Sequence, residues 1–191
     1  MSIVLKNTKL VAGVIILAVL VVVIAIWNSR RGGESVSIDL LAHLGDAQKR
    51  STWTQTPEPL FNVKDIEIAG QTHKAIFAPP NSRIRFKIEV PRRGTLEVFY
   101  GIRPDAWKAD GDGAQFRIGV SDGRTYEEYL REVVNPKSRD RDRKWLAASI
   151  DLSAYEGQMV EIVLNTDPGP PDSKDERNDF CLWGDPKVKG R

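Results

Sequence analysis

The stretch "RIRFKIEV" at residues 83–90 carries the pattern that decides the fold class. Every second residue in it is hydrophobic, and the residues between them are charged. Successive side chains of a β-strand point to opposite faces, so this alternation predicts a strand with one buried face and one wet, largely basic face. The residues expected to face the core are Ile84, Phe86, Ile88 and Val90.

The alternation recurs in "TLEVFYGI" at 95–102, "AQFRIGV" at 114–120 and "MVEIVLNT" at 159–166. The segment "RTYEEYLREVV" at 124–134 also fits a helix, but its alternation and its neighbours favour a strand. Short strands separated by turn residues at this spacing predict an all-β fold, an antiparallel β-sandwich. The further residues expected to face the core are Leu96, Val98, Phe116, Ile118, Val160, Ile162 and Leu164.

The longer stretch "DLSAYEGQMVEIVLNT" at 151–166 is interpreted as structural. Glu156 and Gly157 suit a tight turn between two strands. Leu152 and Tyr155 are expected to anchor that turn against the sheet.

These segments together resemble a known family. "FAPPNSRIRFKIEVPRRGTLEVFYGIRPDAW", "DGAQFRIGV", "KWLAASIDLSAYEGQMVEIVLNT" and "LWGDPKV" look like the galactose-binding-like jelly roll, or carbohydrate-binding module, of bacterial envelope proteins. The resemblance extends over residues 61–188 and implies a two-sheet jelly roll. Relatives of this kind often bind carbohydrate through loops at one end, sometimes with a structural calcium ion, while many bind no sugar. The resemblance transfers no ligand residue by position.

The N-terminal region contains an apolar run, "LVAGVIILAVLVVVIAIW", at residues 10–27. A helix of that length spans about 27 Å, which is close to the hydrocarbon thickness of a bilayer. We therefore predict a retained single-pass transmembrane helix, and a cleaved signal peptide is the alternative. The flanking charges do not decide the orientation; we expect a bacterial inner-membrane protein whose C-terminal domain is periplasmic.

The expected organisation is a tail at 1–9, the span at 10–27, a linker at 28–36, a short amphipathic helix at 37–52 and the β-sandwich domain at 53–191. The helix is predicted because Ile38, Leu41 and Leu44 recur at a spacing of three, with Ser37 as a possible N-cap. Such a helix packs on the edge of the domain or docks against a membrane partner.

Composition argues against several function classes. The net charge of +2, from 28 basic and 26 acidic residues, indicates no nucleic-acid partner. One cysteine and two histidines form no cluster with zinc-ligand spacing. No G-x-S-x-G, P-loop or H-E-x-x-H motif is present, so we expect no enzyme, no cofactor and no metal.

The loop "WKADGDGAQ" at 107–115 holds the candidate ligand-binding residues Trp107, Asp110 and Asp112. An aromatic ring in a loop offers a flat face to a sugar. The aspartates supply hard oxygen atoms of the kind that calcium needs, although ordinary Asp-Gly turn chemistry also explains them. Other aromatic residues could also present a flat face to a sugar, although most are expected in the core: Trp53, Trp145, Trp183, Tyr126 and Tyr129.

The charge run "KSRDRDRK" at 137–144 supplies the candidate docking residues Arg139, Arg141 and Arg143, and a solvated loop is the alternative.

These observations leave two classes of function. The first is a non-catalytic accessory subunit of a respiratory, photosynthetic or secretory membrane complex, with integral membrane subunits and the lipid bilayer as partners. The alternative is a membrane-anchored carbohydrate-binding module of the cell envelope, with a glycan as partner.

Overall fold

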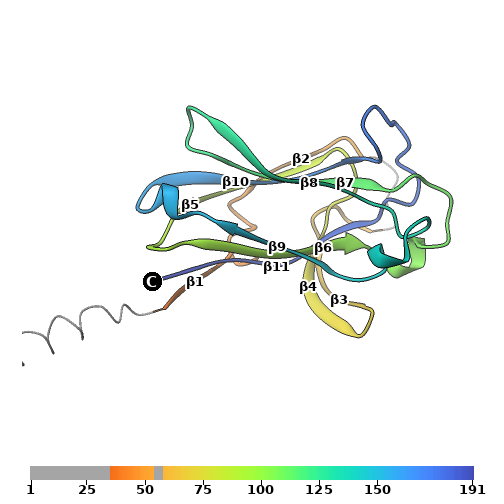
Figure 1. The fold of residues 1–191 in the computed structure, drawn as a ribbon, viewed down its shortest axis with the longest axis horizontal. Coiled ribbons are helices and arrows are strands. Elements are labelled where there is room, and N and C mark those ends of the chain that lie inside the picture. Colours follow the sequence, from red (N-terminus) through yellow and green to blue (C-terminus); the bar gives the residue numbers. More distant parts are fainter. Residues whose placement is uncertain (1–34, 54–57) are drawn as a thin grey trace, which may run out of the picture. The chain divides into compact units, whose positions relative to one another are not determined.

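The computed structural model describes residues 35–53 and 58–191. Residues 36–191 form one compact unit, a sandwich of two antiparallel sheets seen as two layers in Figure 1. Its strands are β1 (Val36–Asp39), β2 (Gln48–Ser51), β3 (Val63–Ile68), β4 (Gln71–Phe77), β5 (Ser82–Glu89), β6 (Thr95–Ile102), β7 (Ala114–Ser121), β8 (Tyr126–Val134), β9 (Leu146–Asp151), β10 (Met159–Pro168) and β11 (Cys181–Gly190). Short 3-10 turns lie at η1 (Pro104–Ala106), η2 (Asp140–Asp142) and η3 (Ser153–Tyr155).

The six-stranded sheet has the order β3-β4-β11-β6-β9, and β1 pairs with β11 beyond the end of β4. The five-stranded sheet has the order β2-β5-β10-β7-β8. Neighbouring strands are mostly distant in sequence, so the register of each sheet depends on long-range pairing. The predicted all-β, antiparallel β-sandwich is confirmed.

The core fills the space between the two sheets. Every residue that the alternation assigned to the buried face is buried, and β8 is a strand. Trp183 packs edge-on against Phe116 with ring centroids 5.1 Å apart, and Tyr100 lies 5.2 Å from the same Phe116 ring. Burial of large side chains such as these stabilises the domain by roughly 1.5–3 kcal/mol each.

The turn within 151–166 also forms as expected. Leu152 and Tyr155 are buried, and Gly157 has a φ of 72°, a conformation that favours glycine. The stretch closes the connection between β9 and β10, so its pattern is explained by the fold.

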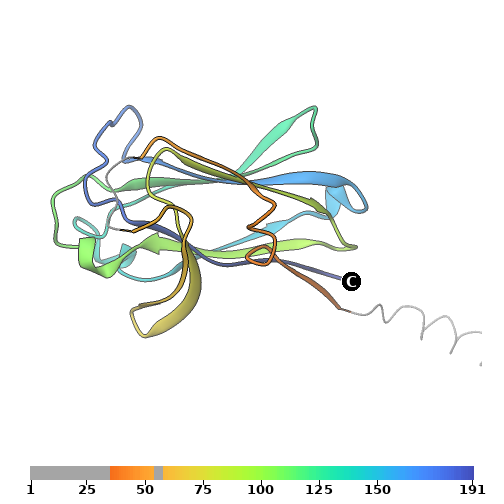
Figure 2. The ribbon, with the colours of Figure 1, turned by 180° about the vertical axis from the view of Figure 1, so that it is seen from behind.

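The amphipathic helix predicted over 37–52 was wrong. Residues 36–39 form β1 instead, residues 40–47 form turns, and residues 48–51 form β2. Figure 2 shows this segment passing from one layer to the other. The backbone of β1 forms ladder hydrogen bonds with β11. The Asp39 carboxylate accepts a hydrogen bond from the Leu41 amide, and this local bond favours a turn over a helix.

Leu40, Leu41 and Leu44 still contact the core, but from turns. The folded domain therefore begins at β1, before the expected boundary at residue 53. The predicted span at 10–27 lies outside the described residues. Within 35–53 and 58–191, no helix has the length and apolar character needed to cross a membrane.

Candidate functional site

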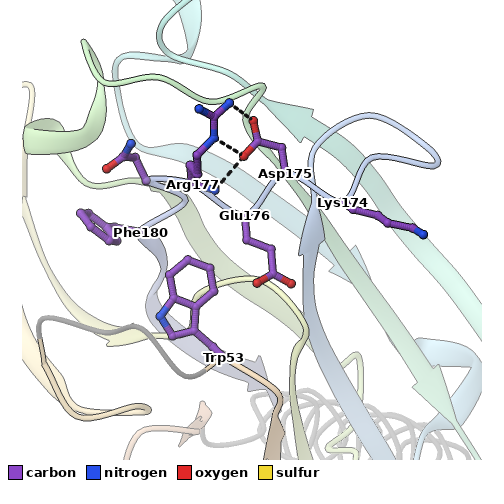
Figure 3. A pocket seen from close by; sticks show the side chains of 7 residues that line it. Trp53, Lys174, Asp175, Glu176, Arg177 and Phe180 are labelled. Carbon is purple, nitrogen blue, oxygen red and sulfur yellow. Dashed lines mark hydrogen bonds and ion pairs between the residues drawn. The ribbon is translucent and has the colours of Figure 1, made fainter.

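A pocket of about 380 Å³ opens at one end of the sandwich, and we call it the loop-end pocket. Trp53, which follows β2, forms one wall, and the loop between β10 and β11 supplies the rest (Figure 3). The lining residues are Trp53, Lys174, Asp175, Glu176, Arg177, Asn178 and Phe180. The pocket therefore joins two segments that are more than a hundred residues apart.

The aromatic part of the pocket consists of Trp53 and Phe180. Figure 3 shows the Trp53 indole beside the Glu176 carboxylate, with the Phe180 ring on the other side of the indole. Two neighbours pack against the Phe180 ring. The Arg103 guanidinium lies 4.6 Å from the ring centroid of Phe180, and the ring centroid of Phe77 lies 6.2 Å from it. The indole nitrogen of Trp53 is buried and has no hydrogen-bond partner among the described residues.

The polar rim is organised by an ion pair. The Arg177 guanidinium donates to both carboxylate oxygens of Asp175, at 2.8 and 2.7 Å, and the Arg177 amide donates to the same carboxylate at 3.1 Å. The bonds to Arg177 lower the pKa of Asp175 to about 2. Glu176 accepts a hydrogen bond from the Asn81 side-chain amide. The rim thus presents preorganised, planar polar groups beside an aromatic wall.

A buried carboxyl group, that of Asp179, and the partly buried carboxyl group of Asp112 lie close to the same loop. The Asp179 side chain is 2% exposed, and one oxygen of Asp179 and one of Asp112 have no hydrogen-bond partner among the described residues. Burial, followed by the nearby charges of Asp112, Asp175 and Glu176, raises the pKa of Asp179 to about 8. Asp179 is therefore mostly protonated at neutral pH.

Asp112 is also enclosed, because the Ser173 hydroxyl donates to it at 2.6 Å and the Gly169 backbone lies against it. A Cβ atom on Gly169 would come within 2.3 Å of the carboxylate, so a larger residue there would force the Asp112 side chain to move. Within the described ranges, no group of three or more His, Cys, Asp or Glu side chains is arranged to hold a metal ion.

The predicted ligand-binding residues separate in the structure. Asp110 and Asp112 lie beside the β10–β11 loop, since Asn178 donates to the Asp110 carbonyl and Ser173 donates to Asp112. Asp110 itself is exposed and pairs with Lys137 at 2.6 Å. Trp107 does not line the loop-end pocket, and its indole donates to the Ile102 carbonyl at 2.7 Å while the ring packs on the core.

The predicted docking arginines mainly hold their own loop together. Arg139 pairs with the buried Asp142 at 2.7 Å. Arg143 donates to the Pro136 carbonyl at 2.7 Å. Arg141, with 72% of its side chain exposed, is the most accessible of the three. Docking through these residues remains a prediction.

Sequence reasoning did not select the residues that form the loop-end pocket. Trp53 was one of several aromatic residues considered as sugar contacts, and no residue of the β10–β11 loop was among the candidate ligand-binding residues. Trp53 lies outside every alternating segment, as Trp107 does. That position was the sequence feature that could have marked Trp53 as a loop residue able to contact a ligand.

Comparison with known proteins identifies the type of fold. No family model matches the chain. An uncharacterized protein of Archaeoglobus fulgidus is 32% identical over 115 residues, which cover 60% of this chain and 25% of that protein. The match thus spans about a quarter of the relative's length.

Solved structures of carbohydrate-binding modules share the architecture. The tandem CBM51 modules of a family 98 glycoside hydrolase from Streptococcus pneumoniae match at 14% identity with a TM-score of 0.52, covering 83% of this chain and 48% of that one. A structure of the Clostridium perfringens ZmpB CBM51-2 and INT domains with GlcNAc matches at 14% identity with a TM-score of 0.50, covering 81% of this chain and 32% of that one. At such identity the likeness shows the fold, an all-β jelly roll like that of carbohydrate-binding modules.

Proposed function

We propose that this chain is a non-catalytic, membrane-anchored glycan-binding protein that holds a sugar residue in the loop-end pocket. One observation carries the proposal: the Trp53 indole lies beside a preorganised polar rim in a solvent-open pocket. The apolar face of a sugar packs on an aromatic ring, while its hydroxyl groups exchange hydrogen bonds with carboxylates and guanidinium groups. Pockets that combine apolar walls with a few convergent polar groups are typical small-molecule sites.

The fold supports this reading, because the similar solved structures are carbohydrate-binding modules and one of them is a complex with GlcNAc. The accessory-subunit hypothesis has less support, since Arg139 and Arg143 bind groups within their own loop. The apolar run at 10–27 supports anchoring in a membrane. For the β-sandwich we propose the periplasmic side of the cell envelope.

A binding role fits the titratable groups better than catalysis does. Asp179 is the carboxyl group with a raised pKa near the pocket, but it lines only a crevice of about 10 Å³. That volume holds about one water molecule and no substrate. Asp175 is engaged by Arg177 and is ionised, so it has no proton to donate at neutral pH.

The test is a glycan array probed with the full chain in a detergent that has no sugar headgroup. Hits are remeasured by calorimetry with wild type, Trp53→Ala and Trp107→Leu, and thermal melts verify folding. We expect Trp53→Ala to weaken binding at least about tenfold, which corresponds to about 1.4 kcal/mol. Trp107→Leu is expected to keep the affinity. Binding that survives Trp53→Ala, or an array without hits, would contradict the proposal.

A further inference from the structure

The outer face of the five-stranded sheet carries a row of arginines. The strand registers align Arg50 of β2, Arg83 of β5, Asn165 of β10, Arg117 of β7 and Arg131 of β8. Directly paired residues point to the same side of a sheet, so these side chains cross all five strands side by side. We call this set the arginine row.

The charges in the row are only partly balanced. Arg117 donates to Asp167 at 2.7 Å, and Arg131 donates to Glu128 at 2.6 Å. Arg83 donates instead to the neutral Asn165 side chain at 2.7 Å and has no carboxylate partner among the described residues. The remaining donors of the Arg83 guanidinium are therefore available to an anion.

A pocket of about 270 Å³ lies beside the middle of the row, and we call it the sheet-face pocket. Val163, which is 4% exposed, gives it an apolar patch between charged side chains. Its lining residues are Arg83, Arg85, Arg117, Ser121, Tyr126, Glu161 and Val163. Three arginines thus line one concave site. Glu161 is the carboxylate that lines it with them, and Arg117 is also paired with Asp167 and Glu128 outside that lining.

An aromatic wall completes the sheet-face pocket. The β7–β8 hairpin is bulged between Ile118 and Gly119, and its tip stands away from the layer in Figure 1. Tyr126 lies directly on Gly119, since a Cβ atom there would come within 2.3 Å of the tyrosine ring and hydroxyl. Tyr126 remains 47% exposed, so part of its ring is accessible beside the arginines.

We propose that the sheet-face pocket binds an acidic glycan, with the guanidinium groups of Arg83 and Arg117 holding a sugar carboxylate or sulfate and Tyr126 packing on the sugar ring. Arginine binds oxyanions through paired hydrogen bonds to two of their oxygen atoms, and a neutral sugar offers no such anionic group. The arginine row extends the site across the sheet, so a polymer with anionic groups on successive residues binds more tightly than a single sugar.

The choice of a glycan among polyanions rests on the proposed glycan-binding function and on the low net charge of the chain. The whole chain has a net charge of only +2, which provides little non-specific attraction to nucleic acid.

The experiment measures retardation of the full chain in native gels that contain polygalacturonate, dextran sulfate or neutral dextran, in a detergent without a sugar headgroup. Retardation by either acidic polymer but not by dextran supports the proposal, and the polymer that acts identifies carboxylate or sulfate as the group. Arg83→Ala and Tyr126→Ala are each expected to weaken it at least about tenfold.

Arg92→Ala is the matched control, because Arg92 is 76% exposed and lies outside the arginine row. It removes the same charge and is expected to leave retardation unchanged. Arg83→Lys keeps the charge but loses the paired donors, and an intermediate loss is expected. Equal losses in Arg83→Ala and Arg92→Ala would overturn the proposal, as would equally tight, Arg83-dependent binding of single-stranded DNA.

The two proposals fail separately. Array hits that depend on Trp53 but not on Arg83, without retardation by either acidic polymer, would remove only the sheet-face site. Retardation that depends on Arg83, together with an array that shows no Trp53-dependent hit, would support the sheet-face site and remove the loop-end pocket.

Discussion

The buried Asp179 carboxyl group should make the stability of this domain depend on pH near neutrality. Its pKa is raised from 3.8 to about 8 in the folded protein. Between these values the folded state holds a proton that the unfolded state has released. The free energy of unfolding therefore falls as pH rises from about 4 to about 8, by up to about 1.4 kcal/mol per pH unit.

Asp179→Asn removes this titration while preserving the shape of the side chain. We expect wild type to lose about 2–3 kcal/mol more than the variant between pH 5.5 and pH 7.5, so the stability of the variant relative to wild type rises by that amount over the interval. Carboxyl groups with lowered pKa, such as Asp110 and Asp175, titrate below this window and do not interfere.

The assay is urea unfolding of the full chain followed by tryptophan fluorescence at pH 5.5, 6.5 and 7.5. Asp172→Asn is the matched control, because Asp172 is exposed in the same loop and its φ of 71° is one that asparagine also adopts. Parallel pH profiles for wild type and Asp179→Asn would refute the reasoning, since they would show that the buried carboxyl group keeps an ordinary pKa.

Further predictions concern packing, backbone conformation and membrane attachment. Ile162→Ala is expected to cost about 2–5 kcal/mol by thermal melting, whereas Glu161→Ala, on the outer face, stays within about 0.5 kcal/mol; equal losses would mean that the register is wrong. Gly157→Ala is expected to cost about 1 kcal/mol because its φ is 72°, and Gly45→Ala, also in open space but without a positive φ, is the control whose equal loss would contradict this. The full chain should stay with membranes after alkaline carbonate extraction, and deletion of 10–27 should release it; retention of the deleted form would contradict the predicted anchor.

The strand segments and the buried residues were predictable from the sequence because a strand's two faces repeat with a fixed period. Ile84 and Phe86 alternate with charged residues, and the structure buries both. Turn signals such as Gly157 are equally local, since a positive φ is a property of one residue. These signals need no knowledge of distant parts of the chain.

Residues 37–52 show where local signals fail. Their hydrophobic spacing fits a helix, but the backbone of β1 pairs with the last residues of β11, and β2 pairs with β5. The hydrogen bonds and burial gained from these distant partners exceed a helix propensity that is small for each residue.

The two candidate sites depend on tertiary structure in the same way. Trp53 and Arg177 line the same pocket only because the sheets bring the end of β2 beside the β10–β11 loop. Arg83 and Arg117 become neighbours through the register of β5 and β7 on β10, which a shift of one residue would turn to opposite faces. The sequence alone therefore determined the alternation of buried and exposed residues in each strand. The grouping of side chains on one face was decided by pairing between distant strands. That pairing depends on the free energy of the whole assembled core, which no single segment contains.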